Sequence, residues 1–251
     1  MKKKPAVILL TMILLLCAAC SDVAKYSETE ETVKVAVITG GHDFDREAFF
    51  SMFDSFNGID YRHLPQKDQS EIFEDVDRFP YDVIVLYNMT QKISPKRQVN
   101  FTKLLNNGIG LVAIHHSMAA FGNFPEYRKI IGGRFYVEDT IENGVAHKKS
   151  GYKHDVNISI NIEDKRHPIT NVLEGFTVQD ETYNNCIIEQ DNHILLTTDN
   201  PASDKSICWT RKYGRSKVCY IQQGHGPGIF EDESYKTLVA RAIKWSAGEL
   251  N

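Results

Sequence analysis

The sequence is poor in cysteine, and the cysteines beyond its first 20 residues are not spaced for metal binding. Its 251 residues hold five cysteines, of which two lie in the first 20 positions. The other three, Cys186, Cys208 and Cys219, are widely separated, form no CxxC pair and are odd in number. This pattern argues against a zinc-thiolate centre and against a disulfide framework. Pairing of Cys208 with Cys219 on adjacent strands stays open, but we expect buried free thiols.

The chain also lacks a run of basic residues beyond its first few positions. The formal net charge is −4, from 29 lysines and arginines against 33 acidic residues. Loss of Lys2, Lys3 and Lys4 with a cleaved leader makes the remaining chain three units more negative. Since proteins bind nucleic acid by neutralising its phosphates, we expect no nucleic-acid partner.

Several cofactor and metal motifs are absent as well. Neither a GxGxxG dinucleotide fingerprint nor a Walker lysine accompanies the glycine pair Gly40-Gly41, which argues against a nucleotide site. We therefore expect no cofactor. A cluster of histidines and carboxylates would suit a divalent metal, but no HExxH or comparable ligand spacing supports one.

The N-terminal residues have the order of a secretory signal. Three lysines precede an almost uncharged run over 5–20. Its apolar part is shorter than the roughly 18 residues that a membrane-spanning helix needs, and polar Ser21 and Asp22 follow at once. We expect a signal peptide at 1–19 rather than a permanent transmembrane helix.

The end of this signal resembles the lipobox of bacterial lipoproteins, in which the final cysteine is acylated. Small residues precede Cys20, although Cys17 stands where the lipobox usually has leucine. We expect a lipid anchor on Cys20 and a flexible polar tether over 20–32. These features place the protein in the bacterial cell envelope, facing the periplasm or the surface. The alternative is ordinary cleavage near Ala19 followed by secretion.

The rest of the chain, 33–251, predicts a single α/β domain. A hydrophobic content of 42% is enough for a sizeable core. In the first half, short β-branched runs alternate with helical patterns, which predicts a parallel sheet with right-handed crossovers, a flavodoxin-like half. The predicted strands are 33–39, 59–64, 82–87 and 110–115, and the predicted helices are 45–56 and 94–105.

Beyond about residue 150 the pattern changes. Apolar and polar residues alternate, and strand-like runs follow one another at short intervals, which predicts antiparallel or mixed pairing. A helix with one apolar stripe ends the chain. The predicted strands are 153–162, 176–183, 186–189, 193–198, 206–211 and 217–222, and the predicted helix is 235–246.

Histidines follow several predicted strands. Ligands of an open α/β sheet bind outside the carboxyl ends of its strands, so residues there are candidates for a site. His42 follows the first strand, His115 ends the fourth and His116 comes directly after it, and His225 lies in a glycine-rich turn after the last. Because consecutive strand residues point to opposite faces, we expect at most one of His115 and His116 in a crevice.

Two acidic residues, Asp180 and Glu181, stand inside a predicted strand. Carboxylates are costly there unless they are paired or functional, so both are site candidates. The remaining histidines receive less specific roles. We expect backbone hydrogen bonding for His167, a loop position with access to the crevice for His147, and surface or packing positions for His63, His154 and His193.

A series of short motifs spans most of the chain in a fixed order. These are GGH at 40–42, GLVAIHHS at 110–117, IGGRF at 131–135, HPIT at 167–170, DETY at 180–183, CWTRKYG at 208–214 and GH at 224–225. In this order they resemble the ThuA-like family, named for trehalose utilisation. The resemblance implies a fold similar to class I glutamine amidotransferases, a three-layer sandwich, and a role connected with sugars, particularly oxidised disaccharides.

One departure from the amidotransferases bears on activity. Those enzymes carry a nucleophilic cysteine in the turn after the fourth strand, where this chain has His115, His116 and Ser117. Thiolate attack on an amide needs a cysteine activated by a nearby base, and no cysteine is present here, so we expect no amidotransferase activity. Ser117 lacks the GxSxG elbow that would make it a replacement nucleophile.

Two hypotheses of different classes remain. In the first, histidines and a carboxylate shuttle protons for isomerisation, elimination or hydrolysis of a sugar or keto-sugar. In the second, the same crevice binds a sugar or a partner protein without turnover, and Glu181 pairs with Arg134 or Arg211. We favour catalysis because acid–base residues outnumber aromatic ones among the candidates. The expected catalytic residues are His115, His116, Glu181 and His225, and the expected substrate contacts are His42, Arg134, Asp180, Tyr183, Trp209 and Arg211.

Overall fold

The computed structural model describes residues 32–67, 70–142 and 144–251. The chain divides into residues 1–30 and 31–251, and everything described below belongs to the second unit. The predicted signal peptide, Cys20 and the predicted tether up to residue 31 lie outside the described residues. Within the described ranges, no helix is long and apolar enough to cross a membrane.

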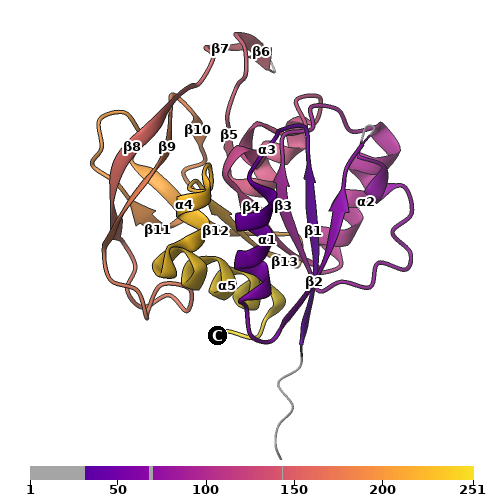
Figure 1. The fold of residues 1–251 in the computed structure, drawn as a ribbon. Helices are drawn as coiled ribbons and strands as arrows, with labels where there is room; N and C mark the ends of the chain where they lie inside the picture. Colours follow the sequence, from indigo (N-terminus) through magenta and orange to yellow (C-terminus); the bar gives the residue numbers. More distant parts are fainter. Residues whose placement is uncertain (1–31, 68–69, 143) are drawn as a thin grey trace, which may run out of the picture. The chain divides into compact units, whose positions relative to one another are not determined.

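The described part of the chain builds a nine-stranded mixed sheet in the order β2-β1-β3-β4-β13-β12-β11-β8-β9 (Figure 1). Neighbours among the first five strands of this order pair in parallel, and the remaining pairs are antiparallel. The strands are β1 (Val33–Gly40), β2 (Ile59–Pro65), β3 (Val83–Asn88), β4 (Gly110–Ile114), β8 (Gly151–Ile162), β9 (Phe176–Asn184), β11 (His193–Thr197), β12 (Ser206–Tyr213) and β13 (Ser216–Ile221). Two small pairs stand apart from this sheet, β5 (Gly133–Arg134) with β10 (Ile187–Ile188) and β6 (Thr140–Glu142) with β7 (Val145–His147).

The α/β class and the parallel first half predicted from the sequence are confirmed. Strand β13 comes from the second half of the chain, yet it pairs in parallel with β4 and completes the parallel part of the sheet. The second half is therefore mixed, because β8, β9, β11 and β12 continue the sheet with antiparallel neighbours.

Helices cover both faces of the sheet and give it two apolar cores. The helices are α1 (Arg46–Asp54), α2 (Pro95–Asn106), α3 (Pro125–Ile131), α4 (Pro227–Glu231) and α5 (Glu233–Ala247), joined by 3₁₀ turns η1 (Glu71–Phe73) and η2 (His115–Ala119). Along β1, Val35 and Val37 pack with α1 and α5 in one core, while Ala36 and Ile38 pack with α2 and α3 in the other. This alternation follows from the two-residue period of a strand and produces a three-layer sandwich.

The helix boundaries follow local chemistry. The side chain of Asp45 accepts a hydrogen bond from the Ala48 amide at the start of α1, and Asp232 caps α5 in the same way. Helix α2 begins after Ser94 with Pro95 in the first turn, as predicted, but the Ser94 side chain makes no capping hydrogen bond. Cys208 and Cys219 are buried free thiols, as expected from their spacing.

Candidate functional site

A small cavity lies where the parallel strands end. Its volume is about 180 Å³, and its walls are rich in imidazole rings. The lining residues are His42, Met89, His115, His116, Ala119, Phe135, Tyr152, His154, Glu181 and Tyr183. Several of the residues that the sequence suggested for a site, among them three histidines, Glu181 and Tyr183, meet here.

His42 reaches the cavity because the chain turns sharply after β1. Gly40 and Gly41 have φ angles of 141° and 77°, which only glycine adopts readily. A Cβ on Gly41 would lie 2.5 Å from the backbone nitrogen of Thr90, so the turn also needs the missing side chain. The glycine pair thus brings His42 close to the carboxyl end of β3.

His115 and His116 both line the cavity, which corrects the prediction that only one of them would face a crevice. The strand ends at Ile114, one residue earlier than predicted, and His115 takes a positive φ of 54° at the start of η2. Because the chain leaves the extended conformation there, the alternation of strand faces no longer applies. The two rings lie edge to face, with centroids 5.3 Å apart.

Strand β9 lies at the edge of the sheet. Its residue Asp180 nevertheless contacts the turn that follows β13. There the carboxylate of Asp180 accepts hydrogen bonds from the backbone nitrogens of Gly224 at 2.7 Å and His225 at 2.9 Å. Tyr235 donates to the Gln223 carbonyl in the same turn. Asp180 therefore holds the backbone that carries His225 and does not itself line the cavity.

Glu181 is the centre of the site. One carboxylate oxygen, Oε2, lies 3.0 Å from His115 Nε2 and 3.0 Å from His225 Nδ1. The other oxygen, Oε1, lies 3.7 Å from His154 Nδ1. Glu181 is only 5% exposed, so three imidazoles surround a buried negative charge. The structure thereby joins His115, Glu181 and His225, which the sequence had suggested as catalytic.

The pKa values of these groups reflect their pairing. Burial acts to raise the pKa of Glu181, but hydrogen bonds from His115 and His225 outweigh it and hold the pKa at about 2. The hydrogen bond to Glu181 raises the pKa of His225 above its usual value. Burial lowers the pKa of His116 well below its usual value, and the neighbouring imidazoles of His115 and His42 add to the effect. His116 is therefore neutral at physiological pH, while Glu181 is ionised.

The orientation of His115 is fixed by its other nitrogen. Nδ1 lies 2.7 Å from the carbonyl oxygen of Gln222, which only accepts, so Nδ1 carries a hydrogen. Nε2 is then the atom that faces Glu181 and, at 3.1 Å, the hydroxyl of Tyr183. A second contact anchors the backbone here, because the hydroxyl of Tyr220 donates to the His115 carbonyl.

His116 supplies a different kind of surface. Its ring stacks on His42, with centroids 4.7 Å apart, and packs against Tyr87 at 4.4 Å. Among the described residues, no side chain forms a hydrogen bond with either of its ring nitrogens, although the residue is buried. A buried nitrogen without a side-chain partner is uncommon in folded proteins.

Three of the predicted substrate contacts, Arg134, Trp209 and Arg211, do not line this cavity. Trp209 is fully buried and donates from Nε1 to the Ile131 carbonyl at 2.7 Å. Arg134 is also buried and donates to the Ala120 carbonyl. Glu181 pairs with neither Arg134 nor Arg211, the pairing by which the binding hypothesis could have explained its burial, because its partners are imidazoles.

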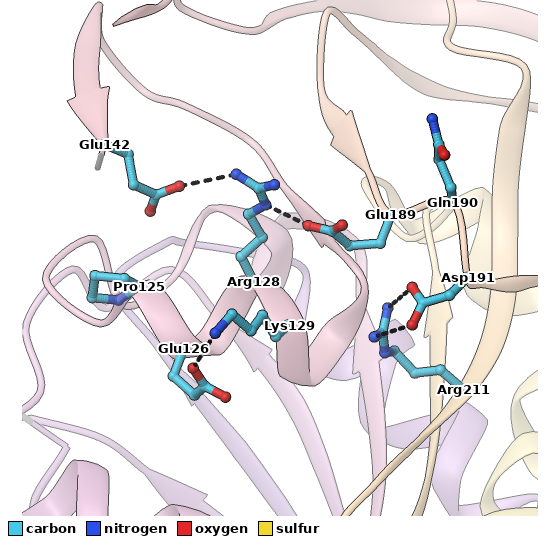
Figure 2. Close-up of a pocket in the computed structure, with 9 residues that line it drawn as sticks. All are labelled: Pro125, Glu126, Arg128, Lys129, Glu142, Glu189, Gln190, Asp191 and Arg211. Carbon is cyan, nitrogen blue, oxygen red and sulfur yellow. Dashed lines mark hydrogen bonds and ion pairs between the residues drawn. The ribbon is translucent and has the colours of Figure 1, made fainter. Parts of the chain in front are cut away.

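Arg211 belongs to a second, larger cavity of about 660 Å³ (Figure 2). There it pairs with Asp191, and Arg128 bridges Glu142 and Glu189. Lys129 pairs with Glu126 on α3. The labelled cations in Figure 2 each face a carboxylate, so every one of these cations is already paired within the chain. The two ion pairs of Arg128 join α3 to β6 and to the segment after β10.

His154 is exposed, as the expected surface position implies, but it also lines the cavity, which the sequence did not indicate. Strand β8 carries a bulge at this point, because Lys153 pairs with Thr182 and the next pair is Val156 with Asp180. His154 and Asp155 therefore both lie opposite Glu181. The alternating pattern around His154 contains no sign of the extra residue, and only the pairing of β8 with β9 reveals it.

Comparison with known proteins gives the family. The family profile described as ThuA, trehalose utilisation, matches residues 34–246. A comparison with curated protein sequences found no match. A ThuA-like protein from Parabacteroides merdae superposes with a TM-score of 0.69 at 18% identity, covering 86% of this chain and 90% of that one. Another from Bacteroides uniformis gives 0.59 at 20% identity, covering 89% and 94%.

A more distant structure supports the fold alone. A GMP synthase component from Thermoplasma acidophilum superposes with a TM-score of 0.51 at 10% identity, covering 87% of this chain and 96% of that one. The turn after β4, where class I glutamine amidotransferases carry their nucleophilic cysteine, holds histidines in this chain. Because the family profile spans nearly all of the described residues, this chain belongs to the ThuA family.

Proposed function

We propose that the domain takes one ring of a small carbohydrate, of the keto-sugar or oxidised-disaccharide class, into the imidazole-lined cavity and moves protons on it. The observation that carries this proposal is the carboxylate of Glu181, buried and held 3.0 Å from both His115 and His225 beside an open cavity. Groups of this kind transfer protons in isomerisation, elimination and hydrolysis, and all three act on a sugar that bears a carbonyl.

The size and polarity of the cavity support a sugar ring. A volume of about 180 Å³ is below the 300–1,000 Å³ typical of sites for drug-sized ligands, so a second ring of a disaccharide would remain outside. The stacked rings of His42 and His116 offer a flat face, and Tyr152, His154 and Glu181 offer hydrogen-bonding groups for hydroxyls.

The decisive experiment incubates the purified protein with oxidised and with ordinary disaccharides and analyses the products. We expect conversion of an oxidised sugar by the wild type, and binding without conversion by His225→Ala. His193→Ala is the matched control, because His193 also pairs with a carboxylate, Asp164, but lies outside the cavity. If both sugars bind and neither is altered, with or without added divalent metal, the domain is a binding module and the catalytic proposal is wrong.

We also propose that the protein is exported and held in the cell envelope by a lipid on Cys20. The basic start, the apolar run and the cysteine that ends it support this. Labelling of cells with a fatty-acid probe should mark the wild type and leave Cys20→Ala unmarked. Equal labelling of both, or retention of both in the cytoplasm, contradicts the anchor.

A further inference from the structure

We propose that His115, Glu181 and His225 bind one divalent transition-metal ion of the zinc type at the wall of the cavity. This deepens the function proposed above and rests on it for the use of the ion, whereas binding of the ion needs no sugar. The three residues are 66 and 44 positions apart in sequence, on η2, β9 and the turn after β13, so no sequence motif announces them.

The donor atoms have the right kinds and spacing. One nitrogen from each histidine and one carboxylate oxygen all lie within 4.8 Å of one another. Bonds of about 2.0–2.2 Å around a tetrahedral ion would place ligand atoms roughly 3.3–3.5 Å apart. The contacts of 3.0 Å from Glu181 Oε2 to each histidine need to open by a few tenths of an ångström. The two histidine nitrogens, which lie within 4.8 Å of each other, need to approach by up to about 1.3 Å to reach tetrahedral spacing.

The hydrogen-bonding groups of the site favour a cation between the two histidine nitrogens and the Glu181 oxygen. His115 uses its Nδ1 hydrogen on the Gln222 carbonyl, so only a second hydrogen on Nε2 or a metal ion can join Nε2 to the carboxylate of Glu181. Two lone pairs 3.0 Å apart repel unless a proton or a metal ion lies between them. His225 Nδ1 faces the same oxygen, and one divalent ion would satisfy all three groups together.

The surroundings match a metal centre in two further respects. The ring of His115 is oriented by a backbone carbonyl, which is the usual outer contact of a ligating histidine. The ligand set is two histidines and one glutamate, and it leaves a coordination position open, as in catalytic zinc sites.

A bound ion would supply Lewis-acid chemistry toward a carbonyl or hydroxyl oxygen of the sugar. His154 and His42 are not among the three ligands, and they line the cavity from β8 and from the turn after β1. They would then be the side chains that hold and move protons at the substrate. The role of Glu181 changes accordingly, from proton carrier to ligand.

The test is titration of chelator-treated protein with ZnCl₂ in a calorimeter, together with the visible spectrum after addition of CoCl₂. We expect one ion per chain for the wild type and for His193→Ala, and at least roughly a hundredfold weaker binding for Glu181→Gln and His225→Ala. His225 is partly exposed, so its replacement by alanine should leave the fold intact, which circular dichroism checks. Wild-type binding no tighter than that of His225→Ala overturns the proposal.

The outcomes separate the two proposals. If one zinc ion binds but no sugar is converted, the metal site is supported and the proposed carbohydrate chemistry is wrong. If conversion is unchanged after the chelator has removed all metal, the carbohydrate chemistry is supported and the ion has no role in it. Loss of conversion on chelation and its return with zinc supports both.

Discussion

Asp180 and His225 are joined through the backbone, since Oδ1 of Asp180 accepts the amide hydrogen of His225 at 2.9 Å. The next residue in β9, Glu181, contacts the imidazole of the same histidine at 3.0 Å. Two consecutive acidic residues therefore hold one histidine, the first by its main chain and the second by its side chain. This division explains why both carboxylates are buried, and it makes Asp180 a positioning residue.

Replacing Asp180 by asparagine should weaken this arrangement. The amide group offers one oxygen where the carboxylate offered two, and its NH₂ would face a backbone N–H of Gly224 or His225. We expect a loss of about 1–3 kcal/mol in the free energy of unfolding, measured in urea. The ¹⁵N shifts of the His225 ring should change as well, and Asp191→Asn at an exposed ion pair should alter neither. Lower stability with unchanged ring shifts would show that Asp180 does not position His225.

Gly41→Ala should destabilise the turn that presents His42. The positive φ of 77° is strained for alanine, and the added Cβ would lie 2.5 Å from backbone atoms of the β3 end. We expect a loss of about 1–3 kcal/mol in the free energy of unfolding. Gly226→Ala is the matched control, because its φ is −120° and nothing lies within 4 Å of the new Cβ. Equal stability of the two variants would contradict the argument from the turn.

Much of the fold was predictable because its signals are local. The β-branched runs at 33–39 and 82–87 form β1 and β3, and the proline after Ser94 begins α2. The histidines after parallel strands were predictable as a group, since the carboxyl ends of such strands meet at one edge. These features depend on neighbours in sequence or on a general rule of sheet topology.

The parts that were not predictable depend on contacts between distant segments. The sequence pattern predicts neither the contact of β9 with the turn after β13 nor the bulge beside His154. The positive φ of His115 is equally hidden, because no glycine or proline announces it. Trp209 was expected to contact a sugar on the strength of its residue type, but its side chain fills the core between the sheet and α3.

Trp209→Phe tests that last assignment. The change removes the hydrogen bond to the Ile131 carbonyl and part of a fully buried ring, so we expect a loss of about 2–4 kcal/mol in the free energy of unfolding. Affinity for a sugar should stay within about twofold of the wild type, because Trp209 does not line the cavity. A variant that keeps its stability but loses sugar binding would restore Trp209 to the substrate site.

His167 should make stability depend on pH in the mildly acidic range. Burial, followed by repulsion from His193, lowers its pKa from 6.5 to about 4. Its ring packs against Trp245 with centroids 5.1 Å apart, and Nδ1 accepts the Ile169 amide, which requires an unprotonated nitrogen. Between these pKa values the unfolded chain binds more protons than the folded one, so the free energy of unfolding falls as the pH falls.

The contribution of His167 is therefore fully present above about pH 7 and is lost as the pH drops toward about 4. His167→Asn keeps an acceptor for the Ile169 amide but removes the titrating group. Because the ring is half buried and solvent screens its charge, we expect the stability difference between wild type and variant to shift by about 1–2 kcal/mol between about pH 7.5 and 4.5. The measurement is urea unfolding at several pH values, with His147→Asn on β7 as the control. A difference that stays constant across this range would show that His167 takes up its proton as readily in the folded domain as in the unfolded chain.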